Sequence, residues 1–160
     1  MGNMTLPEIM KIIEAIVPTA ANSIGTGDYV CLKNVKRAWV VCQHYTAADN
    51  DVILGLYEAT DVAAGTKAAV TATVPIWQNT DTSLSDALAR GTDAATITID
   101  TGALKNQIAV FEWDPALFTA GYDCLAVYCT DEGHASNIFS ALYVLEMRYM
   151  SNLPPTVITD

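Results

Sequence analysis

The chain has few charged residues, and positive charge is the scarcest. Its 160 residues include 8 lysines and arginines against 18 acidic residues, a formal net charge of −10. Nucleic-acid binding takes most of its affinity from clustered Lys and Arg side chains that face phosphates. The one basic cluster here is Lys33, Lys36 and Arg37, and three cations are typical of a solvated turn. The composition therefore predicts a protein that does not bind nucleic acid.

The shortage of charge also bears on assembly. Charged residues make up 16% of the chain and apolar residues 51%, whereas roughly 25% charged residues is usual in globular proteins. A single domain of this length can bury about two-thirds of its unfolded surface in one core. Few charges remain for the rest of the surface, so we expect another subunit to cover part of it in a homo-oligomer.

Long apolar runs are missing as well. A membrane-spanning helix needs roughly 18 to 20 apolar residues in succession, and no stretch approaches that length. The N-terminal stretch Met1 to Val17 lacks the basic start of a signal peptide, and Glu8, Lys11 and Glu14 interrupt it. We therefore predict no membrane partner, and a chain that is used in the cytosol or carried out of it inside an assembly.

Cysteines number only four, Cys31, Cys42, Cys124 and Cys129, and each lies in an apolar run. This placement predicts reduced, buried thiols. A zinc site built from Cys42 with His44, or from Cys124 with Cys129, is disfavoured, because Cys124 and Cys129 would face opposite ways on a regular strand. A catalytic thiol needs an electropositive, partly exposed setting, which an acidic chain with apolar cysteine runs does not offer.

Catalytic and cofactor-binding motifs are absent too. The chain has no nucleophile elbow and no phosphate loop. The paired acidic residues Asp49 with Asp51 and Asp131 with Glu132 lack the ligand series and the fixed glycine of a calcium-binding hand. Turns favour Asp for backbone reasons alone. The sequence thus predicts a protein that is not an enzyme and has no catalytic residue, cofactor or metal.

What the chain does contain is a series of short strand patterns separated by turn residues. The apolar stretch from Arg37 to Tyr45 is the strongest of them. This organisation predicts an all-β fold, an antiparallel β-sandwich of jelly-roll type with about eight strands. The expected strands are Asp28 to Leu32, Arg37 to Tyr45, Val52 to Ala59, Ala68 to Trp77, Ala94 to Asp100, Asn106 to Trp113, Tyr122 to Thr130 and Asn137 to Tyr149.

The region before the first of these strands is ambiguous. Apolar residues in Leu6 to Val17 recur at helical spacing, with Pro7 at the start and Pro18 as a stop. The β-branched residues of Lys11 to Val17 favour an extended strand almost equally. We divide the chain into a helix or extended arm with a loop (residues 1–27), a sandwich domain (28–150) and an extended tail (151–160). We also expect Leu6 to Val17 to contribute more to assembly than to the fold; the alternative is a segment packed on the core of its own domain.

Two other features are less regular. Pro75 places the Ala68 to Trp77 strand at an edge or at a bend, and Gln78 to Asp93 fits either short helical turns or an exposed ribbon. Trp39 is expected in the core, whereas Trp77 lies at a strand end and is the better candidate for an exposed contact. The predicted interface residues are therefore Leu6, Ile9, Ile12, Ile13, Ile16 and Trp77.

Five segments together resemble a known group of proteins: GDYVCLKNVKRAWVV, YEATDVAAGTKA, PIWQNTD, YDCLAVYCTD and ALYVLEMRY. In this order they are similar to small structural proteins of tailed bacteriophages and prophages, which coat or cement the capsid. The likeness runs from Asp28 to Tyr149 and consists of strand patterns, so it transfers no functional residue. It implies a β-rich subunit, commonly a trimer, on the capsid lattice.

From this resemblance we expect a non-enzymatic virion protein that decorates or stabilises the capsid and is assembled in the host cytoplasm. Its partners would be the major capsid protein, or other virion proteins, and copies of itself. The alternative is a carbohydrate- or receptor-binding jelly-roll module of a phage fibre, for which Trp77 is the sequence hint.

Overall fold

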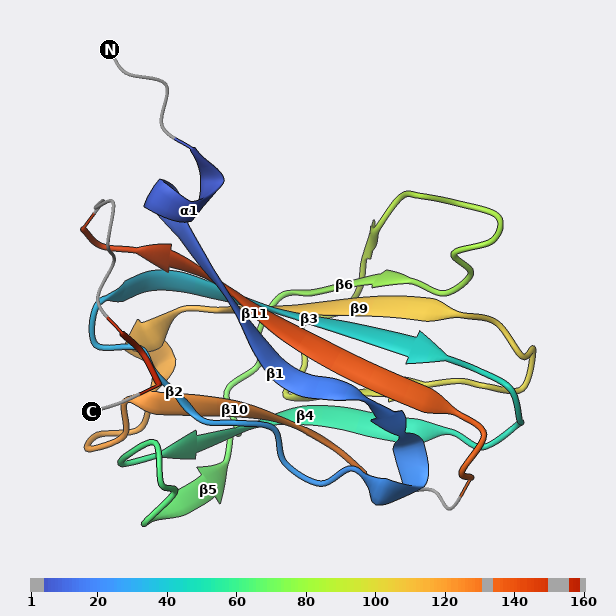
Figure 1. The fold of residues 1–160 in the computed structure, drawn as a ribbon, viewed down its shortest axis with the longest axis horizontal. Helices are drawn as coiled ribbons and strands as arrows, with labels where there is room; N and C mark the ends of the chain where they lie inside the picture. Colours follow the sequence, from blue (N-terminus) through green and yellow to red (C-terminus); the bar gives the residue numbers. More distant parts are fainter. Residues whose placement is uncertain (1–4, 131–133, 150–155, 159–160) are drawn as a thin grey trace.

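The computed structural model describes residues 5–130, 134–149 and 156–158. It is an all-β fold with 49% strand, in which two antiparallel sheets form a sandwich and one small helix lies near the N-terminus (Figure 1). The predicted fold class is therefore confirmed. The elements are α1 (Leu6–Ile9), β1 (Met10–Ala20), β2 (Val30–Cys31), β3 (Val35–Tyr45), β4 (Val52–Ala59), β5 (Lys67–Ala69), β6 (Ile76–Asn79), β7 (Ala89–Arg90), β8 (Thr96–Ile99), β9 (Gln107–Trp113), β10 (Cys124–Cys129) and β11 (Ile138–Met147), with short 3₁₀ turns at Ala21–Ser23 and Pro115–Leu117.

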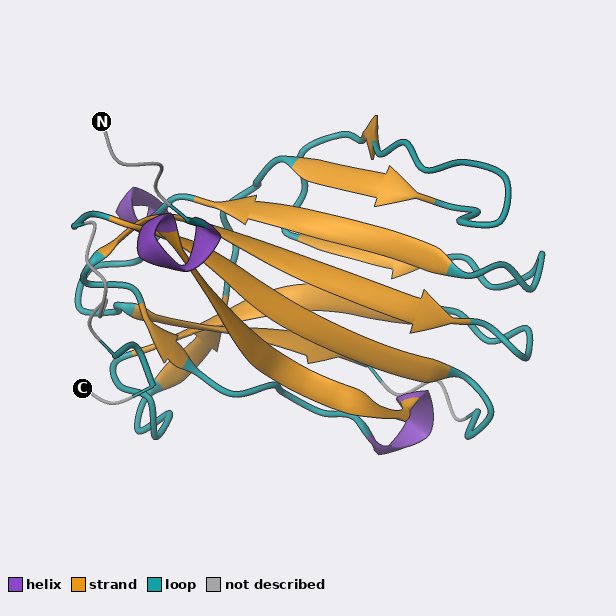
Figure 2. Ribbon diagram, turned by 45° about the horizontal axis from the view of Figure 1, so that its top comes forward, coloured by secondary structure: helices purple, strands orange, loops and turns teal. Residues whose placement is uncertain are grey.

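The larger sheet has six strands in the order β1-β11-β3-β9-β6-β7 (Figure 2). The smaller sheet has the order β2-β10-β4-β5, and β8 also pairs with β4. Strands β5 and β8 follow one another along β4, because β5 pairs with residues 57–59 and β8 with residues 52–55. The chain crosses repeatedly between the sheets, so each sheet contains strands from both halves of the sequence.

The structure decides the ambiguous N-terminal segment in favour of a strand. Only Leu6–Ile9 is helical, and β1 runs along β11 at the edge of the six-stranded sheet. The predicted stop at Pro18 is wrong. Pro18 is tolerated at an edge, where its missing N–H breaks no inner ladder, and the register shifts between Ile16 and Thr19.

This placement also bears on the expected role of the segment. Ala15 and Ile16 are buried in the main core, so β1 contributes to the fold of its own subunit. By contrast, α1 contains no buried residue. That the segment contributes more to assembly than to the fold stays a prediction. A contact of this segment with a neighbouring subunit remains a prediction.

The expected Ala68 to Trp77 strand is split in two. β5 belongs to the smaller sheet and β6 to the larger, and the chain crosses between them with Val70 and Val74 buried on the way. The bend predicted from Pro75 is thus correct. Beyond β6, residues 80–88 form an exposed, largely irregular ribbon that leads to β7, where Arg90 lies opposite Trp77. The ribbon contains one short turn, in which the Asp81 carbonyl accepts from the Leu84 and Ser85 N–H groups at 3.2 Å, so both interpretations of Gln78 to Asp93 hold in part.

The core lies between the two sheets. Trp113, Tyr143, Phe111 and Phe139 are its largest fully buried side chains. The Tyr143 hydroxyl donates to the Asp28 carbonyl at 2.8 Å and accepts from the Val127 backbone N–H at 3.0 Å. Tyr143 belongs to the larger sheet and Val127 to the smaller one, so this hydroxyl joins the two layers.

Part of the predicted C-terminal tail is packed. Residues 151–155 and 159–160 lie outside the described residues, but Val157 is buried in the main core. Its carbonyl accepts a hydrogen bond from the Cys31 backbone N–H at 2.7 Å. At this point the tail is part of the domain and packs beside β2.

Candidate functional site

The outer face of the six-stranded sheet is apolar where an antiparallel sheet normally faces water. Residues alternate along each strand, and the alternate positions of β3 and β11 that point inward belong to the core. The apolar outward positions of neighbouring strands then meet in two rows, one across three strands and one across four. These rows form a surface that we call the apolar band: Ile12, Val144 and Trp39 in one row, and Leu142, Val41, Val110 and Trp77 in the other.

All side chains of the band except that of Val110, which is 8% exposed, are partly accessible. Ile12 is 53% exposed and Leu142 is 42% exposed, while Trp39, Val41, Val144 and Trp77 are half-buried against one another. Tyr45 and Ile138, which are paired across β3 and β11, continue the apolar surface at the far end of the sheet. A contiguous patch of this kind marks a binding or assembly surface more often than scattered apolar residues do.

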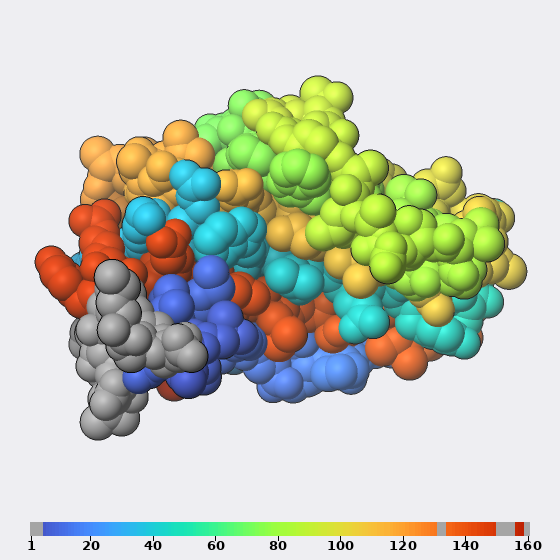
Figure 3. Space-filling model, turned by 90° about the horizontal axis from the view of Figure 1, so that it is seen from above, coloured from blue at the N-terminus to red at the C-terminus, as the bar shows by residue number. Residues whose placement is uncertain are grey.

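A groove of about 480 Å³ lies at the β6 side of the band. Val41, Ile108 and Val110 line it from the sheet, and Leu88 and Asp86 line it from the ribbon after β6. Figure 3 looks onto this outer face, with β1 in blue, and shows the ribbon in yellow-green lying across one side of it. The band is therefore bounded on this side by a raised wall.

Internal polar contacts hold that wall in place. The Asn79 amide donates to the Ser85 carbonyl at 2.7 Å, and Lys105 and Asp81 form an ion pair at 3.0 Å. The ribbon thus has a defined position without contributing a large core. It is suited to shape the border of a contact surface.

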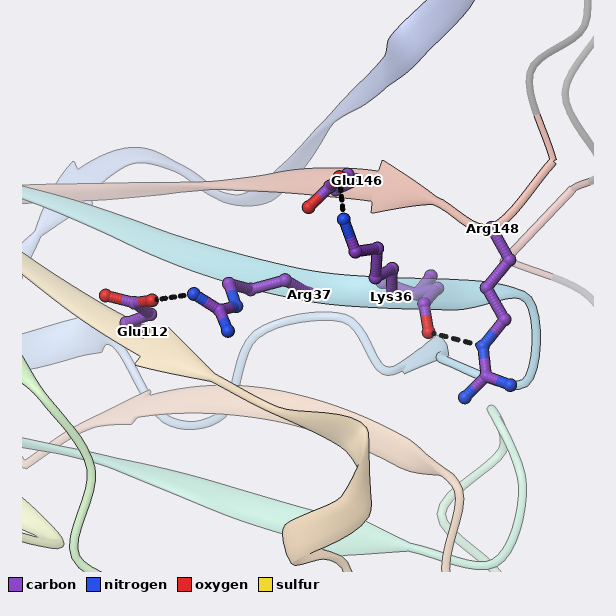
Figure 4. Close-up of polar contacts among 6 residues, drawn as sticks. Lys36, Arg37, Glu112, Glu146 and Arg148 are labelled. Carbon is purple, nitrogen blue, oxygen red and sulfur yellow. Dashed lines mark hydrogen bonds and ion pairs between the residues drawn. The ribbon is translucent and has the colours of Figure 1, made fainter.

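The basic cluster predicted as a solvated turn is engaged in ion pairs. Lys36 Nζ lies 2.7 Å from Glu146 and Arg37 lies 2.6 Å from Glu112 (Figure 4). Lys33 lies 3.2 Å from Asp123. Exposed pairs of this type contribute only about 0–1 kcal/mol each to stability. Their effect here is to neutralise charge beside the apolar band.

The predicted interface residues divide between surface and core. Ile12 and Trp77 both belong to the apolar band and lie toward opposite edges of the same sheet face. Leu6 of α1 is exposed. Ile9 is half-buried. Ile13 packs against the main core and Ile16 is part of it, so neither side chain is available to a partner.

The tryptophans are placed differently from the expectation. Trp39 was predicted in the core, but it points outward and is half-buried in the apolar band. Trp113 takes the core position, with its ring 5.1 Å from that of Phe118. One face of Trp77 is covered by the Arg90 guanidinium, 5.6 Å from the ring centroid.

Sequence reasoning missed five residues of the band, namely Trp39, Val41, Val110, Leu142 and Val144. The signal was present in the unbroken apolar runs AWVVC and ALYVL. Such runs are typical of strands buried on both faces. They therefore suggest a second covering layer, which this chain does not supply for the outer face among its described residues.

The cysteines lie in buried settings. All four cysteines are free and buried, as predicted. Burial raises the pKa of the Cys42 thiol far above its usual range, and the nearby Cys129 adds to this effect. Cys129 faces the main core while Cys124 faces a separate cluster on the other side of its strand. The expectation that the two point in opposite directions is confirmed.

Two other predicted groups have structural roles. His44 is 1% exposed, and its Nδ1 lies 2.9 Å from the Thr46 hydroxyl. Burial lowers its pKa. The Asp51 carboxylate accepts from the Thr101 backbone N–H at 2.8 Å and so joins the loop before β4 to the loop after β8. Asp131 and Glu132 lie outside the described residues.

These features define an antiparallel β-sandwich with an uncovered apolar sheet face. No family model matches the sequence, and no curated protein matches it. Among solved structures, the chain is similar to the SPBc2 prophage-derived protein YomS, with a TM-score of 0.46 and 12% identity over 91% of this chain and 98% of that one. A virus-like particle of the extra small virus of the giant freshwater prawn Macrobrachium rosenbergii gives a TM-score of 0.20 and 10% identity, over 85% of this chain and 79% of that one. Neither TM-score reaches 0.5, and neither likeness defines a function for this chain.

Within the described ranges, no helix combines the length and apolar character that a membrane crossing requires.

Proposed function

We propose that this chain is a non-enzymatic structural protein of a tailed-bacteriophage virion, which decorates or stabilises the capsid through contacts between subunits. It would assemble in the host cytoplasm as a homo-oligomer, with three copies as the expected number, and bind the major capsid protein or another virion protein at the capsid surface. The sequence resemblance supplies the biological setting. The apolar band is the observation that supports a role in contact.

The physical case rests on what the band would gain from a partner. Removing apolar surface from water contributes about 25 cal/mol for each Å², and a standard interface buries roughly 800 Å² on each side. The band presents seven apolar side chains on one nearly continuous sheet face, flanked by Glu14 and Arg90 at the ends of its second row. Aromatic anchors inside a polar rim are typical of protein interfaces.

A contact of this kind would stabilise a shell by mass action, because the partner binds only the folded subunit. The ion-paired side chains of Lys36 and Arg37 lie beside the band and fit the polar rim of an interface, where charges are kept. The fibre-type alternative is less well supported. A sugar platform needs an open aromatic face, whereas Arg90 covers one face of Trp77.

Light scattering and capsid binding test the proposal together. The 17.1 kDa chain should have about three times that mass in solution or on capsids. Leu142→Asp, in the middle of the band, should yield a monomer that no longer binds capsids of the parent phage. Thr98→Asp is the matched control, because Thr98 is exposed on β8 of the other sheet.

Two results would contradict the proposal. One is a wild-type monomer that also fails to bind those capsids. The other is assembly that Leu142→Asp leaves intact. Binding to a glycan in an array screen, lost in Trp77→Ala, would favour the fibre alternative instead.

A further inference from the structure

Two cysteines that are far apart in the sequence lie opposite each other on the smaller sheet. Cys31 of β2 pairs with Cys124 of β10. The Leu32 N–H donates to the Asp123 carbonyl at 2.8 Å, while the Cys31 N–H donates instead to Val157. Cys31 and Cys124 therefore form a non-hydrogen-bonded pair, the position at which antiparallel strands bring side chains closest together.

Both side chains point to the same side of the sheet. They belong to the second buried cluster, with Tyr29, Ala59 and Ala126, which is separate from the main core. Cys31 is 7% exposed and Cys124 is fully buried. The two thiols are thus held together in a dry environment, next to the surface.

A carboxylate completes the group. The Cys124 thiol donates to Asp123 Oδ1 at 3.2 Å, and one ligand atom from each of Cys31, Asp123 and Cys124 lies within 4.8 Å of the other two. In a tetrahedral zinc site the metal–sulfur bond is about 2.3 Å, so two bound sulfurs lie roughly 3.8 Å apart. The sulfur atoms, within 4.8 Å of each other, are thus at most about 1 Å too far apart for that spacing.

The surrounding charge suits a divalent cation. Two thiolates and one carboxylate would carry three negative charges against the two positive charges of the ion. Lys33, whose Nζ lies 3.2 Å from Asp123 Oδ2, balances the remaining one. Thiolate ligands select thiophilic ions such as Zn²⁺, and the side chain of Asp123 is 29% exposed, which provides an entry route.

We propose that Cys31, Cys124 and Asp123 form a binding site for a thiophilic divalent cation, Zn²⁺ or its analogue Cd²⁺, that fastens β2 to β10. Such a site would differ from the sequence-based expectation of no metal, which considered Cys42 with His44 and Cys124 with Cys129. β2 is only two residues long and lies at the sheet edge, so a metal cross-link would secure a weak strand and the Val157 segment that bonds to it. Binding would release the thiol protons and stabilise the fold.

Cadmium titration of the reduced, chelator-treated protein tests the site. We expect one ion per chain, an ultraviolet thiolate-to-metal absorption band, and a higher melting temperature with Zn²⁺. Cys31→Ala and Cys124→Ala should each abolish the band. Asp123→Asn, at a partly exposed position, should weaken binding by about ten-fold or more, since even outer-shell changes commonly cost that much.

The matched control is Cys129→Ala, which removes a thiol of the same strand that faces the main core; this variant should bind like the wild type. Circular dichroism establishes that each variant is folded. Absence of the thiolate band in the wild-type protein overturns the proposal without any variant. So does a band that persists when both Cys31 and Cys124 are replaced, or a native Cys31–Cys124 disulfide found by mass spectrometry under non-oxidising conditions.

Discussion

The two sheets differ in whether the apolar residues of their outer faces are covered. On the five-stranded sheet, Cys124, Ala126 and Ala59 point outward but are fully buried, because Tyr57 and the 60–66 turn with Val62 and Ala64 cover them. On the six-stranded sheet, the apolar band points outward, and Val110 is its one side chain that the described residues bury. The described residues therefore complete one outer face and leave most of the other open.

The difference lies in local geometry. The turn after β4 folds back over its own sheet, held by the Asp61 carboxylate, which accepts from the Gly65 N–H at 3.0 Å. Tyr57 and Tyr128 stack with centroids 4.6 Å apart. The ribbon after β6 instead stands at the side of its sheet and lines the groove. An apolar face left open in this way is where a partner gains most from binding.

The largest effect is expected from placing the same charge on both outer faces. Ala126→Asp would bury an unpaired carboxylate and lower the free energy of unfolding by about 3–5 kcal/mol. Leu142→Asp, in the open band, should cost less than about 1.5 kcal/mol in the dissociated monomer, because Leu142 is already 42% exposed. Urea denaturation at low protein concentration measures both values. Equal losses would mean that the two faces do not differ.

A smaller loss of stability is expected from a substitution at Gly55, because the Tyr128 ring packs closely against this glycine on the covered face. A Cβ added at Gly55 would lie 2.4 Å from the Tyr128 hydroxyl oxygen, so the ring would have to leave its place beside Tyr57. Gly55→Ala should therefore reduce stability by about 1–3 kcal/mol. The control is Gly25→Ala, where a Cβ meets nothing within 4 Å. Thermal melts of the two variants that coincide would contradict this packing.

Between the two faces, His44 should make stability depend on pH. Burial lowers its pKa in the folded state below the unfolded value of about 6.5. The unfolded chain then binds more protons as the pH falls, so stability is full above about pH 6.5 and declines below it. His44→Gln should remove this decline, and His134→Gln, at an exposed position, should retain it. Urea midpoints at pH 7.5 and 5.5 distinguish the variants.

The smallest effect is expected at the open end of the larger sheet. Deleting residues 1–9 removes α1, which has no buried residue, and should change the free energy of unfolding by less than about 1 kcal/mol. If Leu6 belongs to the interface, the same deletion weakens oligomerisation. A loss of several kcal/mol in the monomer would show instead that α1 is part of the fold.

Much of the strand layout could be read from the sequence. The alternation and turn residues around Arg37 to Tyr45, Val52 to Ala59 and Asn106 to Trp113 predicted strands that match β3, β4 and β9 closely. The same two-residue period predicted that Cys124 and Cys129 face opposite sides. These properties are local, because strand period and turn chemistry depend on neighbouring residues.

Only the tertiary structure decided which apolar face lies inside. In β3 both faces are apolar, so the period of two could not distinguish Trp39, on the outer face, from Val40 in the core. β1 is a strand because it pairs with β11 at the edge of the larger sheet. Cys31 lies opposite Cys124 because β2 and β10 are neighbours. Strand pairing joins residues distant in the chain, and its free energy comes from long-range burial that no local pattern contains.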